Sequence, residues 1–127
     1  MKAIVHPVKR LEGEIQALSS KNYTTRYMLV AALAKGTSQI QYPAHSEDSE
    51  AMRRCLKDLG ARLEERGHTL AIEGFGDEPR QVKELDVGNA GAVLRFLMSI
   101  ASLCEEVTFV NNYPDSLGKR PHDALIK

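Results

Sequence analysis

The hydrophobic positions along the chain predict helices in three segments. Residues 23–34 are apolar on nearly every side after Arg26, which is typical of a helix buried between two layers. Cap-type and acidic side chains at residues 46–50 predict the start of a second helix. From residue 52 to residue 59 apolar side chains recur at spacings of three and four, so we expect this helix to have one buried face. A third apolar stripe runs over residues 93–104, directly after Gly88-Asn89-Ala90-Gly91. A fourth helix could begin at Arg120-Pro121, since proline suits a first helical turn.

Short apolar or alternating runs predict strands, at residues 3–5, 15–18, 39–42, 63–65, 70–72, 85–87 and 107–110. Their order with the helices is strand, helix, strand, helix and two strands, after which the same order starts again. This order indicates an α/β (α+β) repeat of which about one and a half units are present. We therefore expect a single truncated domain over residues 1–127. It would hold amino-terminal strands in 1–20, a first βαβαββ unit in 21–83 and the start of a second unit in 84–127.

The charge balance and the hydropathy of the chain exclude several functions. Lys plus Arg and Asp plus Glu number 17 each, so no basic excess indicates a nucleic-acid partner, and any anion site must be local. No apolar run approaches the ~18 residues of a membrane span, and the amino terminus does not resemble a signal peptide. Cys55 and Cys104 lie in expected helices and should be reduced and buried, which indicates a cytoplasmic protein.

Three clusters place cationic or hydrogen-bond-donating groups beside the start of an expected helix, where phosphate binds favourably. They are residues 19–26, residues 88–91 with the following Arg95, and Lys119-Arg120-Pro121. Each also has a simpler interpretation, namely a capped helix with solvated charges, ordinary turn glycines, or a solvated basic turn. The histidines are scattered without metal-ligand spacing, and no Gly-x-Ser-x-Gly or Cys-His signature is present. A zinc site or a covalent nucleophile is therefore not expected.

Taken in this order, the clusters resemble the motifs of the enolpyruvyl transferase family, and within it those of the EPSP (5-enolpyruvylshikimate-3-phosphate) synthases. Residues 20–36 are similar to the family's first signature, which places Lys and Arg before an Ala-Ala-Leu-Ala-x-Gly helix. Ser46-x-Asp48 fits the next block, and Gly88-Asn89-Ala90-Gly91-x-x-x-Arg95 matches Gly-Asn-x-Gly-Thr-x-x-Arg. Residues 117–121 resemble the block that ends in Arg-Pro. The four motifs lie in register and span nearly the whole chain.

The resemblance implies transfer of the enolpyruvyl group of phosphoenolpyruvate to the 5-hydroxyl of shikimate 3-phosphate, with release of phosphate, in cytosolic aromatic amino-acid synthesis. It implies no metal and no organic cofactor. Lys21 would be catalytic and would contact both substrates. Asn22 and Arg26 would hold shikimate 3-phosphate, whereas the Gly91 backbone and Arg120 would bind phosphoenolpyruvate. The residues that would support this site are Asp48, Asn89, Ala92 and Arg95.

Three features depart from the family pattern. Ala92 stands where threonine is usual, from which we hypothesise altered sensitivity to glyphosate; inhibition of the full-length enzyme with Ala92→Thr tests this. Lys21-Asn22 also resembles UDP-N-acetylglucosamine enolpyruvyl transferase, which lacks the Gly-Asn-x-Gly block with Arg95 and is the second candidate. Family members are several times longer than this chain. We expect the chain alone to be inactive and to bind substrate weakly, with the missing remainder as its partner, unless it is a non-catalytic anion-binding or structural module.

Overall fold

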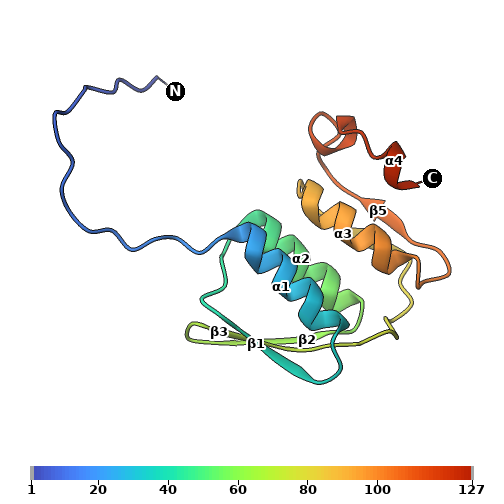
Figure 1. Cartoon of the computed structure of the whole chain (residues 1–127). Helices are drawn as coiled ribbons and strands as arrows, with labels where there is room; N and C mark the ends of the chain where they lie inside the picture. The colour runs from blue at the N-terminus through green and yellow to red at the C-terminus, as the bar shows by residue number, and fades with distance from the viewer. Residues whose placement is uncertain (1, 127) are drawn as a thin grey trace.

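Two helices and a small sheet form the first part of the fold (Figure 1). The structure is a computed structural model that describes residues 2–126. The helices α1 (Lys21–Leu33) and α2 (Glu47–Asp58) pack on one face of a sheet. Its strands β1 (Thr37–Gln41), β2 (Arg62–Arg66) and β3 (Thr69–Glu73) are antiparallel in the order β1-β3-β2. The predicted hairpin is confirmed, and it turns at Gly67, whose φ of 58° suits glycine.

A parallel β-α-β element forms the second part. The strands β4 (Glu84–Asp86) and β5 (Thr108–Val110) pair in parallel, and α3 (Gly91–Ala101) connects them. Parallel neighbours need such a crossover because the chain must return to the same end of the sheet. A 3₁₀ turn, η1 (Leu117–Lys119), and the short helix α4 (Asp123–Ile126) follow. Because α3 packs against α2, the two parts share one core.

The starts of the helices differ in how they are capped. Before α1 the Ser20 hydroxyl accepts a hydrogen bond from the Tyr23 N–H at 3.4 Å. Before α2 Ser46 and Ser49 form a reciprocal capping box. The helix α3 begins after Ala90, which has no capping side chain. The first N–H groups of α3 therefore lack the side-chain acceptor that a Ser, Thr, Asp or Asn would provide.

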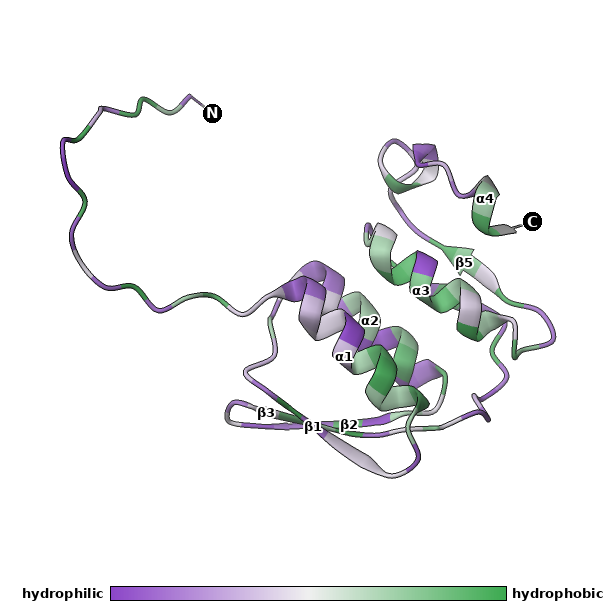
Figure 2. Ribbon diagram, in the orientation of Figure 1, coloured by the Kyte–Doolittle hydropathy of each residue, from purple (hydrophilic) through white to green (hydrophobic). Residues whose placement is uncertain are grey.

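The hydrophobic core fixes the position of α3 relative to α1 and α2. The helix α3 is hydrophobic over most of its length (Figure 2), and its Val93 and Leu97 are fully buried. Burial of one such side chain contributes about 1.5–3 kcal/mol. The other large, fully buried side chains include Met28, Met52, Leu56, Leu70, Ile72 and Leu85, which come from both helices of the first part and from β3 and β4. The core thus sets the relative positions of the helix starts at which the predicted clusters lie.

Gly74 allows the chain after β3 to approach the end of α1, and we expect Gly74→Ala to destabilise the fold by more than about 2 kcal/mol. A Cβ atom at this position would lie 2.5 Å from the carbonyl oxygen of Ala31 and 2.7 Å from that of Ala32. Backbone atoms of a helix cannot move aside cheaply. Urea unfolding followed by circular dichroism measures the loss, and Gly118→Ala is the control because a Cβ there meets nothing closer than 3.9 Å. Equal stability of the two variants would contradict this packing.

The two amino-terminal strands predicted at residues 3–5 and 15–18 are not formed, and this part of the prediction was wrong. Residues 2–20 run as extended chain outside the sheets (Figure 1). Ile4, Val5, Ile15 and Leu18 are between 74% and 96% exposed. A strand is stable only when its N–H and C=O groups pair with a neighbouring strand, and no described strand of this chain lies beside the segment.

The prediction that α1 is buried on nearly every side was also wrong. One face of α1 packs against the sheet and α2, where Met28 and Ala32 are fully buried. On the other face Tyr23, Tyr27 and Val30 are 54–64% exposed. The sequence showed that these positions are apolar, but no described element of this chain covers them.

Other predicted elements are confirmed with shifted bounds. The first helix begins at Lys21 instead of residue 23, and the third ends at Ala101 instead of Cys104. A fourth helix is present, although it begins at Asp123 and not at Arg120-Pro121. Cys55 and Cys104 are free as predicted, but only Cys55 is buried, because Cys104 lies beyond the end of α3.

Candidate anion-binding site

The first predicted cluster forms the amino-terminal turn of α1. The carbonyl oxygen of Asn22 accepts hydrogen bonds from Arg26 Nη1 at 2.9 Å and from Thr25 Oγ1 at 3.2 Å. Ser20, Asn22, Tyr23 and Arg26 line an open hollow of about 340 Å³. Asn22 and Arg26 thus share one accessible surface at the start of a helix, where the helix dipole favours an anion.

The two threonines of this cluster have a structural role. Thr24 and Thr25 are buried, unlike their neighbours Asn22 and Arg26. The hydroxyl oxygen of Thr24 accepts a hydrogen bond from the Ala44 N–H at 2.9 Å. This contact ties the start of α1 to the segment that leads into α2, so it fixes the distance between the two helix starts.

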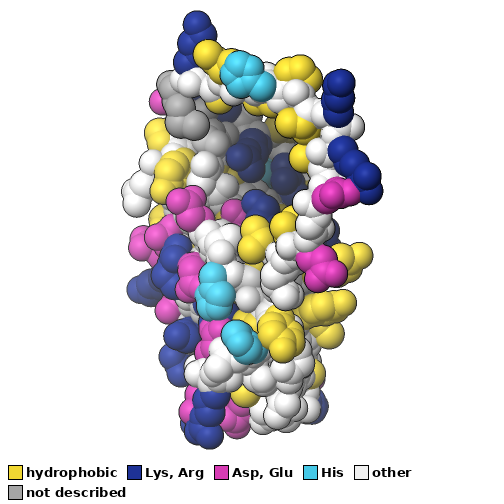
Figure 3. Space-filling model, turned by 90° about the vertical axis from the view of Figure 1, so that its left-hand side faces the viewer, with side chains coloured by type: hydrophobic (Ala, Val, Ile, Leu, Met, Phe, Trp, Pro, Cys, Tyr) yellow, Lys and Arg dark blue, Asp and Glu magenta, His cyan; other side chains and the backbone are white. Residues whose placement is uncertain are grey.

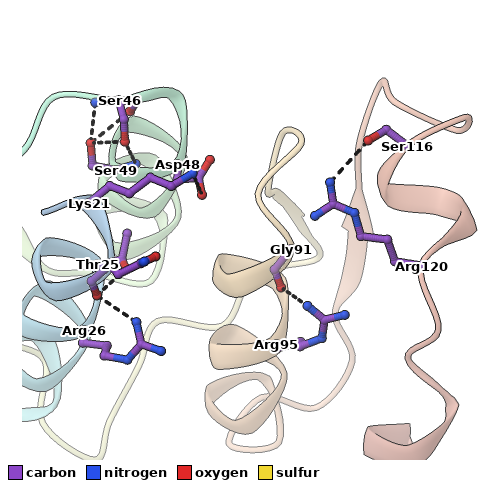
Figure 4. A network of polar contacts seen from close by, with 11 residues as sticks. Lys21, Thr25, Arg26, Ser46, Asp48, Ser49, Gly91, Arg95, Ser116 and Arg120 are labelled. Carbon is purple, nitrogen blue, oxygen red and sulfur yellow. Dashed lines mark hydrogen bonds and ion pairs between the residues drawn. The ribbon is translucent and has the colours of Figure 1, made fainter. Parts of the chain in front are cut away.

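Lys21, the first residue of α1, is directed toward α2 (Figure 4). Its ammonium nitrogen lies 3.0 Å from Asp48 Oδ2. Asp48 is in the first turn of α2, where a carboxylate interacts favourably with the helix dipole. Two predicted site residues, Lys21 and Asp48, are therefore paired with each other.

The second and third clusters meet at Gly91, the buried first residue of α3. A Cβ atom built on Gly91 would lie 2.6 Å from Arg120 Nη1 and 3.3 Å from Arg95 Nη1. Arg95 Nη1 donates to the Gly91 carbonyl at 3.4 Å, and Arg120 Nη2 donates to Ser116 Oγ at 3.3 Å (Figure 4). Two guanidinium groups from separate elements thus converge on one glycine at an uncapped helix start.

These guanidinium groups keep most of their donors free. Among the carboxylates whose side chains the structure describes, none forms an ion pair with Arg26, Arg95 or Arg120. Each guanidinium has five N–H donors in a planar fork that matches phosphate and carboxylate. Since the net charge of the chain is zero, this is a local excess of positive charge, suited to an anion.

A contact between Arg26 and Phe96 links the two parts of the site. The guanidinium carbon of Arg26 lies 5.0 Å from the centre of the Phe96 ring, so α1 and α3 approach each other here. On the face shown in Figure 3, Lys and Arg side chains gather inside the hollowed upper part. The sequence did not predict Phe96 or Ser116 as site residues. The signal for Phe96 was that this aromatic residue does not belong to the apolar stripe of the third helix, which consists of Val93, Leu94, Leu97, Ile100, Ala101 and Cys104.

The remaining predicted residues, Asn89 and Ala92, flank Gly91. Asn89 lies in the turn before α3, and its Oδ1 atom is buried without a hydrogen-bond donor among the described residues. Ala92 is the half-buried second residue of α3. Every predicted site residue thus falls in one of two groups. The group at the starts of α1 and α2 consists of Lys21, Asn22, Arg26 and Asp48. The group at α3 and η1 consists of Asn89, Gly91, Ala92, Arg95 and Arg120.

Cys55 is not a nucleophile, because burial raises the pKa of its thiol to about 12. An unfolded cysteine ionises near pH 8.5. Above that pH the unfolded chain loses a proton that the folded chain keeps, so this thiol makes stability fall by about 1.4 kcal/mol per pH unit until its folded pKa is reached. The natural chain should be more stable than Cys55→Ala, because the alanine variant loses a buried side chain. We expect this stability advantage of the natural chain to decrease between pH 8 and pH 9.5, because the variant has no thiol to titrate. A difference that stays constant in urea unfolding would contradict the raised pKa.

The structure also bears on metals and membranes. Within residues 2–126, no three His, Cys, Asp or Glu side chains are grouped so that they could hold a metal ion. No described helix is long and apolar enough to span a membrane. Apart from the Asp48 carboxylate, the polar groups of the site are cations, amides and backbone N–H groups, which can bind and orient anionic substrates.

Comparisons with known sequences point to one family. A family model described as EPSP synthase (3-phosphoshikimate 1-carboxyvinyltransferase) matches residues 5–127. A 3-phosphoshikimate 1-carboxyvinyltransferase of Deinococcus radiodurans is 55% identical over 124 residues, which are 98% of this chain and 28% of that protein. A relative of the same name from Methanococcoides burtonii is 38% identical, over 92% of this chain and 27% of its own length.

Solved structures show the same fold. An EPSP synthase from Acinetobacter baumannii superposes with a TM-score of 0.74 at 24% identity, over 86% of this chain and 25% of that one. This similarity confirms the predicted fold class. The chain spans about a quarter of the length of the curated relatives that it matches.

Proposed function

We propose, from the premise that the chain belongs to the EPSP synthase family, that it carries part of the active site of an enolpyruvyl transferase. The reaction transfers the enolpyruvyl group of phosphoenolpyruvate to the 5-hydroxyl of shikimate 3-phosphate and releases phosphate. The observation that carries this proposal is the convergence of Arg95 and Arg120 on Gly91. It supplies a small, strongly cationic site of the kind that a molecule with one phosphate and one carboxylate requires.

The proposed roles follow the two groups of the site. Asn22 and Arg26, which share the hollow at the start of α1, hold shikimate 3-phosphate. The Gly91 backbone and Arg120 bind phosphoenolpyruvate, and Lys21 contacts both substrates and acts in catalysis. Asp48, Asn89, Ala92 and Arg95 support these residues.

The physical task of these residues is electrostatic. Both substrates are multiply charged anions that repel each other, so bringing them together requires fixed cations. Groups that are already in place lose little entropy when the substrates meet and can stabilise charge that builds up during addition. The described residues provide fixed cations for this purpose, namely Lys21, Arg26, Arg95 and Arg120.

The remaining part of the protein is needed for catalysis. Since the chain spans about a quarter of its relatives, we propose that residues 21–83 are a first βαβαββ unit that lacks its leading strand, because its elements run α1-β1-α2-β2-β3. Residues 84–127 are then the start of a second unit, and the remainder of the protein is the partner of this chain. Alone, the chain binds substrates weakly and does not turn them over. The setting is cytoplasmic, as for a step of aromatic amino-acid synthesis.

The second candidate, UDP-N-acetylglucosamine enolpyruvyl transferase, is less well supported. The relatives from Deinococcus radiodurans and Methanococcoides burtonii are both 3-phosphoshikimate 1-carboxyvinyltransferases. Arg95 and Gly91, which lie close together in the structure, both belong to the Gly-Asn-x-Gly block with Arg95. This block resembles that of the EPSP synthases and is lacking in the second candidate family.

A chimaera tests the proposed function. This chain replaces the matched 124 residues of the Deinococcus radiodurans relative, to which it is 55% identical. We expect phosphate release only when phosphoenolpyruvate and shikimate 3-phosphate are both present. Lys21→Met should lower kcat by about a hundredfold or more, because a group that stabilises developing charge is lost.

The control for this experiment is Lys57→Met, which removes an exposed lysine in the last turn of α2, at the end of the helix away from Asp48. It should leave the rate unchanged. A folded chimaera that releases no phosphate from the two substrates would contradict the proposed function. So would equal activity of Lys21→Met and Lys57→Met.

A further inference from the structure

The pairing of Lys21 with Asp48 keeps a predicted catalytic cation out of the hollow at the start of α1. That hollow is lined by Ser20, Asn22, Tyr23 and Arg26, and Lys21 is not among its lining residues. Successive side chains on a helix point about 100° apart. Lys21 therefore projects from another side of α1, and its ammonium lies 3.0 Å from the Asp48 carboxylate.

Asp48 is the fixed member of this pair. It lies in the first turn of α2, between the two residues of the capping box, Ser46 and Ser49, and its side chain is 25% exposed. The hydrogen bond between Thr24 and Ala44 holds the start of α1 close to this turn. Lys21 is the mobile member, because its side chain is long and 51% exposed. A change of partner thus requires only rotation of the lysine side chain.

The charges favour such an exchange. A cation at the first residue of a helix is unfavourable beside the positive end of the helix dipole, and Asp48 offsets this cost in the structure. An anion bound in the hollow would interact favourably with the dipole and with Lys21 as well. The Asp48 carboxylate therefore opposes anion binding in the hollow in two ways. It holds the Lys21 ammonium away from the anion, and its own negative charge repels the anion.

We propose that Asp48 is an internal counter-ion that holds Lys21 until a phosphate-bearing ligand replaces it. Asp48 is a positioning residue, since it acts on the ligand through Lys21. The inference rests on the proposed function for the identity of the natural ligands. The exchange itself concerns any phosphate group, and inorganic phosphate is therefore the probe.

The experiment is an NMR titration of the full 127-residue chain with inorganic phosphate, which follows the backbone amides of residues 20–26 and the side-chain signals of Lys21. We expect Asp48→Asn to bind phosphate about two- to fivefold more tightly, the range expected for loss of one solvent-exposed charge contact. The matched control is Glu47→Gln. It makes the same charge change one residue earlier, at an exposed side chain without an ion pair among residues 2–126.

The conservative variant Asp48→Glu should keep an affinity close to that of the natural chain, because it restores the counter-ion. In the Asp48→Asn variant Lys21 has lost its counter-ion. We therefore expect phosphate to shift the Lys21 side-chain signals of the natural chain and of Glu47→Gln toward the positions that these signals have in Asp48→Asn. A purely structural role of Asp48 would lower thermal stability without moving these signals or raising the affinity.

Three results would overturn the inference: equal affinity of Asp48→Asn and Glu47→Gln, weaker binding by Asp48→Asn, or no binding by any variant. Parallel titrations with phosphoenolpyruvate and shikimate 3-phosphate separate it from the proposed function. If Asp48→Asn binds inorganic phosphate more tightly but neither substrate shifts the site, the proposed function fails and the counter-ion role stands. If both substrates bind but Asp48→Asn and Glu47→Gln agree, only the counter-ion role fails.

Discussion

Replacing Gly91 with alanine should weaken binding of phosphoenolpyruvate by about tenfold while the fold is retained. The added Cβ would lie 2.6 Å from Arg120 Nη1, which is too close, and 3.3 Å from Arg95 Nη1. Both contacts are with the far ends of flexible side chains. The guanidinium groups would therefore move away from the start of α3, at little cost in stability, and would no longer converge on a bound anion. Loss of one charge-assisted hydrogen bond is worth about 1.5–3 kcal/mol, which is tenfold or more in affinity.

The measurement is an NMR titration of Gly91→Ala and the natural chain with phosphoenolpyruvate, together with thermal unfolding of both. Alanine is a better helix former than glycine, so α3 itself should not be weakened. Gly118→Ala is the control, because a Cβ there has room and because Gly118 lies in η1, two residues before Arg120. Unchanged affinity in Gly91→Ala would show that the position of the two guanidinium groups does not matter for binding.

Removing the Arg120 guanidinium should also reduce phosphoenolpyruvate affinity by about tenfold or more. Arg120 has no ion pair among the carboxylates whose side chains the structure describes, and among residues 2–126 its guanidinium donates a hydrogen bond to Ser116. Its loss therefore leaves no buried charge behind, and the effect should fall on binding and not on stability. Arg120→Lys should restore only part of the affinity, since an ammonium cannot bind a carboxylate or phosphate through two parallel hydrogen bonds.

The matched control for Arg120→Ala is Arg62→Ala, which makes the same change on β2, where Arg62 pairs with Glu73. Isothermal titration calorimetry compares the two variants with the natural chain. We expect the affinity of Arg62→Ala to equal that of the natural chain. Equal losses in the two variants would mean that the chain attracts phosphoenolpyruvate by its overall charge and not at the Gly91 site.

Much of the local structure could be predicted because it depends on neighbouring residues. The helix start with cap-type side chains at Ser46 and the glycine turn before α3 follow from short sequence patterns. The starts of α1, α2 and α3 could be identified to within two residues, and with them the clusters that contain Lys21 and Gly91, whereas the start expected at Arg120-Pro121 lies at Asp123. This part of the site follows from chemistry that is local to each segment.

The contacts between segments could not be predicted from the residues alone. The distance between Arg95 and Arg120 at Gly91 depends on how η1 packs against α3, which no local pattern specifies. The pairing of Lys21 with Asp48 depends on the relative position of α1 and α2. The strands expected at residues 3–5 and 15–18 failed for the same reason, because apolar composition suggests a strand but does not supply its neighbour.

The central claim is that this chain holds a preformed half-site for phosphate-bearing substrates. The most direct test is a titration of the unmodified chain with shikimate 3-phosphate and then phosphoenolpyruvate, followed by the backbone amide signals of Lys21, Gly91 and Arg120. We expect saturable shifts that are confined to the three segments around these residues. A well-dispersed spectrum that does not respond up to millimolar ligand would contradict a preformed half-site, because the fold would then be intact while the site does not bind.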